Sequence, residues 1–158
     1  MKKQARNLQQ PKSDKTPVNV ETPKATDVVS WRFSSCDKKR WSLLNSDHIS
    51  HDDVVETIIP FLMQTEGQSW SYWLTDRKKK CHEILVSDLN KCARDRLDKM
   101  HVETEKIMGI HLGNKKCLYG YLISGVCYIL WYDSDHGDND SCVCPSYKKG
   151  DKKKHQRR

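Results

Sequence analysis

Three histidines lie in or next to apolar segments of the sequence, where an imidazole could move a proton during a reaction. They are His82 in the segment CHEIL, His111 in IMGIHL and His136 in LWYDSDH. An unperturbed imidazole has a pKa of about 6.5, so it can accept or donate a proton near neutral pH. We take His82 and His136 as candidate catalytic residues, together with Asp133, which precedes His136 in the same segment.

Cleavage of RNA without a metal needs a base for the 2′-hydroxyl, an acid for the leaving oxygen and a cation beside the phosphate. The candidate cations for the phosphate, and tyrosines that could stack on unpaired bases, are Arg94, Arg96, Lys115, Lys116, Tyr119 and Tyr121. Structural alternatives stay open for several of these residues. His82 and His136 can brace the end of an element, His111 can be an ordinary sheet-face residue, Arg96 can form a buried ion pair, and the tyrosines can pack in the core.

The segment from Ile129 to Ser146, ILWYDSDHGDNDSCVCPS, gathers oxygen, nitrogen and sulfur atoms that could bind a metal. Two features weaken that interpretation. Cys142 and Cys144 form C-x-C, not the C-x-x-C pair of ordinary structural zinc sites, and DSDHGDND lacks the glutamate that closes an EF-hand loop. We therefore expect neither a metal nor another cofactor. A small metal-binding domain, with His136, Cys142 and Cys144 as ligands, stays open as an alternative.

The positive charge of the chain is concentrated at its two ends. Of the formal net charge of +7 on 158 residues, the segment 1–27 carries +3 and the segment 146–158 carries +6, which leaves about −2 for residues 28–145. We expect one folded domain at 28–145 between two disordered basic arms, because a chain of this length builds one core. The arms alone would give only non-specific attraction to phosphate, so RNA binding by the domain needs a local basic patch.

The sequence contains no run of about 20 apolar residues and no N-terminal signal segment. We therefore expect a soluble, cytoplasmic protein with no membrane partner. Its seven cysteines are an odd number, which does not suit a fully paired disulfide framework. Thiols, several of them buried, are expected instead.

Hydrophobic periodicity predicts the elements that would position these residues. Alternation in SWRFS predicts a first strand. Ser50 and the apolar stripe after it predict a helix, shortened or kinked by Pro60, and SWSYWL predicts a short helical turn or a packed loop. A further helix is predicted from Ser87 to Met100, and three antiparallel strands joined by tight turns are predicted at 107–112, 116–123 and 126–133. One N-terminal strand, two or three helices and a three-stranded meander indicate an α+β domain.

An ordered set of short motifs resembles a family of small bacterial and phage-borne proteins. The motifs are W-x-F at Trp31 and Phe33, Ser69-Trp70, His82-Glu83-Ile84, A-x-x-R-L from Ala93 to Leu97, L-W-x-D-x-x-H from Leu130 to His136, and Cys144-Pro145-Ser146. The sequence departs from the family where His111 and Cys117 replace arginines and where Cys81-His82 replaces a pair of histidines. If those arginines bind phosphate in the relatives, phosphate binding by this chain is weaker or altered.

The order of elements also resembles the RelE/ParE superfamily of toxins. In that superfamily a face of the sheet binds RNA or a protein target, and an antitoxin helix wraps the toxin. The resemblance implies a toxin-like protein that acts on RNA or the translation machinery as a metal-independent endoribonuclease, with RNA or the ribosome and an antitoxin as partners. Fold alone does not fix function, so one alternative is a non-enzymatic protein-binding module of a phage or mobile element.

Overall fold

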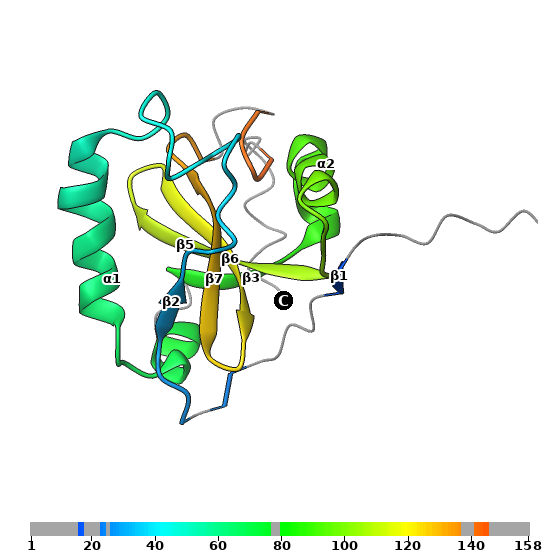
Figure 1. Ribbon diagram of the computed structural model, residues 1–158. Coiled ribbons are helices and arrows are strands. Elements are labelled where there is room, and N and C mark those ends of the chain that lie inside the picture. The colour runs from blue at the N-terminus through cyan, green and yellow to red at the C-terminus, as the bar shows by residue number, and fades with distance from the viewer. Residues whose placement is uncertain (1–15, 18–22, 25, 77–79, 137–140, 146–158) are drawn as a thin grey trace, which may run out of the picture.

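A five-stranded, mostly antiparallel sheet forms the centre of the molecule (Figure 1). The computed structural model describes residues 16–17, 23–24, 26–76, 80–136 and 141–145. The strand order is β2-β7-β6-β5-β3, and only the pairing of β2 with β7 is parallel. The strands are β2 (Ser30–Arg32), β3 (Cys81–Leu85), β5 (Lys106–Gly113), β6 (Lys116–Ile123) and β7 (Val126–Asp133). The expectation of a mixed α+β domain is confirmed.

The three-stranded meander predicted from the sequence is confirmed as β5, β6 and β7. The turn between β6 and β7 has positive φ at both of its residues, 50° at Ser124 and 82° at Gly125, which suits the right-handed twist of a tight hairpin. The turn between β5 and β6 begins with positive φ at Gly113 and Asn114. The predicted first strand is also present, as β2.

β3 was not predicted. It pairs with β5 at the edge of the sheet, with Cys81 opposite Ile110 and His82 opposite Gly109. This pairing places the CHEIL segment in the sheet, whereas the sequence left His82 as a residue that could brace a helix end. β3 is therefore the element that brings His82 next to the meander.

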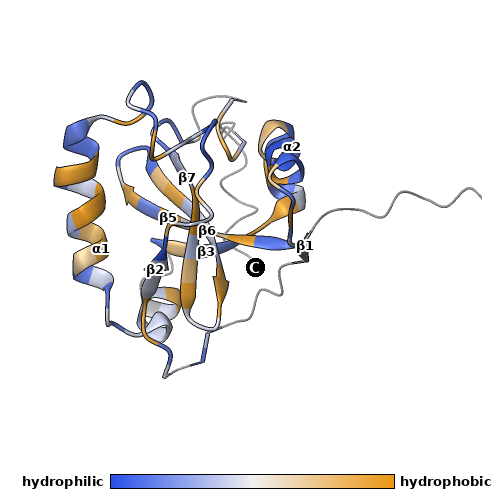
Figure 2. Cartoon of the chain, in the orientation of Figure 1, coloured by the Kyte–Doolittle hydropathy of each residue, from blue (hydrophilic) through white to orange (hydrophobic). Residues whose placement is uncertain are grey.

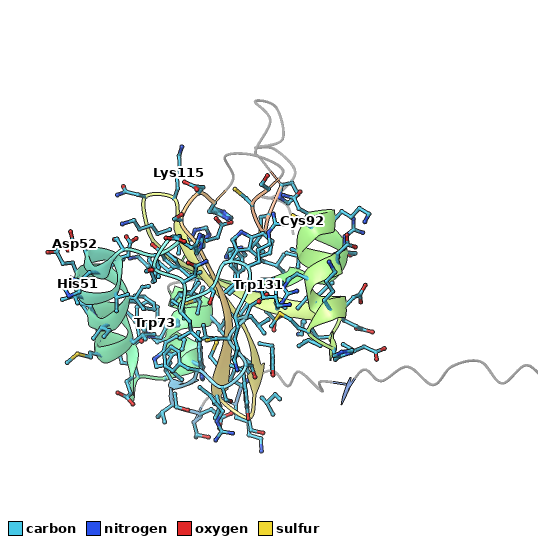
Figure 3. The ribbon with its side chains drawn as sticks, turned by 45° about the horizontal axis from the view of Figure 1, so that its top comes forward. His51, Asp52, Trp73, Cys92, Lys115 and Trp131 are labelled. Carbon is cyan, nitrogen blue, oxygen red and sulfur yellow. The ribbon has the colours of Figure 1, made fainter. Side chains whose placement is uncertain are left out.

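Helices cover both faces of the sheet, with α1 and α2 on opposite sides in Figure 1. The first face packs against η1 (Asp53–Ile58), α1 (Ile59–Thr65) and η2 (Tyr72–Asp76), and its core contains Trp70, Trp73 and Leu118. The second face packs against η3 (Val86–Asp88) and α2 (Lys91–Lys99), and its core contains Tyr119 and Trp131. Figure 2 shows the strands as mainly apolar between these layers, and Figure 3 shows Trp73 beside α1 and Trp131 on the side of α2.

The first helix begins as the sequence predicts. The Asp53 amide donates a hydrogen bond of 3.0 Å to Ser50 Oγ, and the Ser50 amide donates one of 3.3 Å to the Asp53 carboxylate. These reciprocal bonds satisfy amides that have no partner within the helix. The wider π-helical turns of η1 end where α1 begins with Pro60 in its first turn. Pro60 lacks an amide hydrogen, so a change of hydrogen-bond pattern is expected there.

A small parallel pair lies outside the main sheet. β1 (Thr16–Pro17) pairs with β4 (Val102–Glu103), a contact that the sequence did not predict because it falls within the expected arm 1–27. Most of that arm and the tail 146–158 lie outside the described residues. Within the described part of the chain, no helix is both long and apolar enough to cross a membrane.

Candidate functional site

Three imidazoles meet on the α2 face of the sheet, near the turn between β5 and β6. The rings of His82 and His111 stack with centroids 5.2 Å apart and an interplanar angle of 13°. The ring of His136 meets that of His111 edge-on at 4.9 Å. All three histidines are half-buried. The two candidate catalytic histidines thus both contact a third histidine, and we call these three residues the histidine cluster.

The pairing of β3 with β5 explains the stacked pair. His82 lies opposite Gly109, and His111 is the next residue of β5 on the same face, so the two are diagonal neighbours. A Cβ atom on Gly109 would lie 2.8 Å from Ile84 Cδ1 and 3.4 Å from His82 Cε1. The absence of a side chain at Gly109 therefore makes room for His82 against the strand.

The pairing of β5 with β6 adds Cys117 to the histidine cluster. His111 and Cys117 are cross-strand partners, and Cys117 Sγ lies 3.2 Å from His111 Nδ1. The register between the strands shifts between His111 and Gly113. A regular two-residue turn would pair Leu112 with Cys117, so this irregularity is what brings the thiol to the imidazole.

His136 follows β7 and is fixed by two contacts with the β5–β6 hairpin. Its amide donates a hydrogen bond of 2.8 Å to the carbonyl oxygen of Lys115. Its Nδ1 lies 2.6 Å from the hydroxyl of Tyr119, which also lies 3.5 Å from Cys144 Sγ. The position of His136 is therefore determined by the hairpin as well as by the loop in which it lies.

Burial favours the uncharged forms of His111, His136 and Cys117 near neutral pH. It lowers the pKa of His111 to about 4, with a further contribution from the neighbouring His136, His82 and Lys80. Burial also lowers the pKa of His136, and the carboxylate of Asp133 only partly opposes this effect. The pKa of the Cys117 thiol is raised by burial to about 12. The imidazoles of His111 and His136 therefore have a nitrogen lone pair at pH 7, and the thiol keeps its proton.

Asp133 is buried, and its carboxylate binds two backbone amides of the protein. The residue is 2% exposed, and its two carboxylate oxygens accept hydrogen bonds from the amides of Asp135 (3.0 Å) and Val143 (2.9 Å). These bonds shape the loop after β7 and attach residues 141–145 to it. The role of proton carrier predicted for Asp133 does not fit this geometry, because both oxygens are already used by backbone amides.

Some of the residues predicted to contact phosphate instead form ion pairs with carboxylates of the protein. Arg96 donates two hydrogen bonds to the fully buried carboxylate of Asp37, at 2.5 and 2.9 Å, so its structural alternative holds. Lys116 forms an ion pair of 2.5 Å with Asp53. Arg94 is exposed on α2.

Two exposed lysines flank the histidine cluster. Lys115 is exposed in the β5–β6 turn, where Figure 3 labels it, and its carbonyl holds the amide of His136. Lys80 was missed by the sequence analysis. It is exposed, and its carbonyl accepts the amide of His111 at 2.7 Å. Only the pairing of β3 with β5 reveals that proximity.

The two tyrosines predicted to stack on bases are buried. Tyr119 is 0% exposed, and Tyr121 is 7% exposed. The ring of Tyr121 stacks on that of Tyr128 with centroids 5.1 Å apart, and its hydroxyl lies 3.1 Å from Ser35 Oγ. The prediction of base stacking was wrong for both residues, because these rings form the core beneath α2.

The loop after β7 does not itself assemble a metal site in its described residues. Cys142 Sγ donates a hydrogen bond of 2.7 Å to the carbonyl of Asp135. The side chain of Asn90 donates to the carbonyls of Cys142 and Cys144, at 2.8 and 3.0 Å, and so attaches the segment to the start of α2. Asp138 and Asp140 lie outside the described residues. Among the described residues, the potential ligands that do converge are His111, Cys117 and His136, of which only His136 belongs to this loop.

Comparison of the chain with protein-family models, with curated protein sequences and with solved structures gives no match. The resemblances to a phage-borne family and to RelE/ParE toxins therefore stay predictions, and function has to be argued from the histidine cluster.

Proposed function

We propose that this protein is a metal-independent endoribonuclease that cleaves RNA at the histidine cluster. In this reaction an imidazole accepts the proton of a ribose 2′-hydroxyl, and the 2′-oxygen attacks the adjacent phosphorus. The bond from phosphorus to the 5′-oxygen breaks, and a protonated imidazole supplies the proton that this oxygen takes up. The products are a 2′,3′-cyclic phosphate and a 5′-hydroxyl.

The observation that carries this proposal is the convergence of His82 and His136, from segments far apart in the chain, on the ring of His111. A reaction with one proton acceptor and one proton donor needs two groups within reach of the same phosphodiester. His82 and His136 are proposed as this pair, and His111 as the residue that positions them. The sequence singled out both outer histidines, but only the fold brings them together.

Positive charge next to the cluster supports a phosphate substrate. Lys80 and Lys115 are exposed, and the backbone carbonyl of each holds one histidine of the cluster. Lysine is a common phosphate ligand because its ammonium group is a compact point charge. Lys115 keeps the phosphate role that the sequence gave it, and Lys80 is added to it, whereas Lys116 and Arg96 form ion pairs with Asp53 and Asp37.

The proposal extends to a toxin-like role, because uncontrolled RNA cleavage stops growth. The expected experiment is induction of the chain in a bacterial host, with growth and total RNA followed over time. Growth arrest and RNA loss are expected for the wild type and not for His82→Ala or His136→Ala. Normal growth with intact RNA in the wild type would contradict the proposal.

Matched histidine variants make this test specific. His51 is exposed on the first helix, and His101 is exposed after α2. Replacing either with alanine should leave the arrest and the RNA cleavage unchanged. If His51→Ala or His101→Ala relieves the arrest as fully as His82→Ala does, the cluster has no special role.

A second candidate function is protein binding, and one observation favours it. Val55, Ile59 and Met63 recur every four residues along the first helix and are 48%, 45% and 71% exposed, so they form an exposed apolar stripe. Stripes of this kind are used to bind partner proteins. In this case Met63→Glu should abolish the complex with an antitoxin-like partner, whereas Leu44→Glu, at a site also 71% exposed, should not. Retention of the complex by Met63→Glu would remove this candidate.

A further inference from the structure

One sulfur and two nitrogen atoms converge inside the histidine cluster. One potential ligand atom from each of His111, Cys117 and His136 lies within 4.8 Å of the other two. The residues come from β5, β6 and the loop after β7, so no local sequence motif links them.

The separation of the sulfur from one of the nitrogens is close to that expected around a bound zinc ion. With zinc–sulfur and zinc–nitrogen bonds of about 2.3 and about 2.1 Å at a tetrahedral angle, the sulfur and nitrogen lie about 3.6 Å apart. Cys117 Sγ and His111 Nδ1 are 3.2 Å apart. Small side-chain rotations would therefore bring this pair of atoms to the separation of two zinc ligands.

The surroundings of His136 resemble those of a metal ligand. A histidine that binds a metal is normally held by a hydrogen bond at its other ring nitrogen, which fixes the orientation of the ring. The hydroxyl of Tyr119, buried in the core, lies 2.6 Å from Nδ1 of His136. Nε2 is then the nitrogen of His136 that would contact the ion.

We propose that His111, Cys117 and His136 bind a zinc ion through two imidazole nitrogens and one thiolate. This ligand set suits zinc, because imidazole and thiolate are its usual protein ligands and calcium and magnesium prefer oxygen. Three protein ligands leave a fourth position for water. Binding replaces the proton of the Cys117 thiol with the metal, and that proton passes to solvent.

The zinc site does not depend on the RNA chemistry proposed above, and its test measures the metal. The reduced, metal-free protein is titrated with Co²⁺, whose thiolate complexes absorb in the near ultraviolet, and the bound Co²⁺ is then displaced with Zn²⁺. We expect one equivalent to bind with a thiolate charge-transfer band. The melting temperature should also rise when zinc is added, because zinc binds the folded state.

Variants of the three ligands and of their neighbour locate the site. Cys117→Ser should lose the charge-transfer band, and His111→Gln and His136→Gln should each weaken binding by at least about tenfold. Tyr119→Phe, which removes only the hydroxyl held by His136, should weaken it about 10- to 100-fold. Cys127→Ser is the matched control, because Cys127 is also 0% exposed in a central strand but faces the other side of the sheet.

Two results would overturn the zinc site. One is a wild-type protein that shows no thiolate–cobalt band and no rise of melting temperature with zinc. The other is a Cys117→Ser protein, or a His111→Gln protein if the serine variant does not fold, that binds Co²⁺ as the wild type does. Circular dichroism of the metal-free variants separates loss of the ligand from loss of the fold.

Discussion

Two hydrogen bonds from backbone amides to its carboxylate make Asp133 a structural residue at the end of β7. Its carboxylate accepts the amides of Asp135 and Val143 in a place from which water is excluded. An asparagine has one acceptor oxygen, so Asp133→Asn leaves one amide without its partner. We predict a loss of about 1–3 kcal/mol in the free energy of unfolding, measured by denaturant titration.

The neighbouring Asp135→Asn provides the control for this prediction, because Asp135 is exposed. Its stability should remain close to that of the wild type. Folded Asp133→Asn protein should also keep most of its RNA cleavage. If Asp133→Asn is as stable as the wild type but inactive, Asp133 has the proton-transfer role that its geometry argues against.

Some residues of the site could be predicted from the sequence, and others could not. His82 and His136 could be chosen as candidates because imidazole chemistry is visible in the residue type itself. Cys117 and Lys80 could not, because their proximity to His111 depends on a strand irregularity and on the pairing of β3 with β5. Tyr119 and Tyr121 were misassigned because periodicity gives the face of a strand, but not whether a helix covers that face.

At the scale of elements, one buried ion pair connects α2 to the chain after β2. Arg96 on α2 donates to Asp37, whose carboxylate also accepts the indole of Trp131 at 3.1 Å. Removing one partner leaves the other as an uncompensated charge in the core. We predict that Arg96→Met lowers the free energy of unfolding by about 3–5 kcal/mol, measured by denaturant titration.

The exposed pair of Lys91 and Asp95 on the same helix is the control. Lys91→Met should leave stability almost unchanged, because exposed ion pairs contribute little. Equal stability of Arg96→Met and Lys91→Met would show that the pair with Asp37 does not hold α2 in place.

The same ion pair makes stability depend on pH. Burial alone would raise the pKa of Asp37, but hydrogen bonds from Arg96, Trp131 and the amides of Lys39 and Arg40 together hold it below its ordinary value of 3.8. A carboxyl with a depressed pKa stabilises the fold above the pKa of its unfolded form, and this stability is lost as the pH falls. The free energy of unfolding, measured from about pH 5 down to about pH 2, should therefore fall.

Asp37→Asn is the variant that identifies the source of this dependence. Because it has no titrating group at this position, its unfolding free energy should fall less steeply over the same pH range. An equally steep fall would assign the acid sensitivity to other carboxyls, such as Asp53, whose pKa is lowered by its hydrogen bond with Lys116.

Most elements could be predicted because each has its own local pattern. Alternation and two tight turns predicted β5, β6 and β7, and the cap at Ser50 predicted the start of the first helix. β3 could not be predicted in this way. It is a five-residue edge strand with Glu83 and Leu85 exposed, and its conformation is specified by pairing with β5.

At the scale of the whole molecule, helical layers on both faces of the sheet restrict where a substrate can bind. From the sequence, one face of the sheet was expected to be open for binding RNA or a protein. Cores under α1 and under α2 occupy both faces instead, so RNA would have to approach the half-buried histidines beside the β5–β6 turn. Lys80 and Lys115 lie beside that approach.

The two proposals share residues, and this gives a prediction for the whole protein. A zinc ion on His111 and His136 would occupy the imidazole lone pair of His136 that the RNA reaction needs. We predict that RNA cleavage persists with a chelator present and falls when zinc is added at one equivalent or more. Zinc should not lower any residual activity of Cys117→Ser to the same extent, because that variant lacks the thiolate ligand.

The most direct test of the central claim is cleavage of two RNA oligonucleotides by the purified, metal-free protein. One is all-ribose, and the other has a single 2′-deoxyribose at the position where the first is cut. Cleavage at the histidine cluster predicts a 2′,3′-cyclic phosphate from the first oligonucleotide, no cut at that position in the second, and loss of activity in His82→Ala and His136→Ala. Failure to cut the all-ribose RNA, or equal cutting of both oligonucleotides, would contradict it.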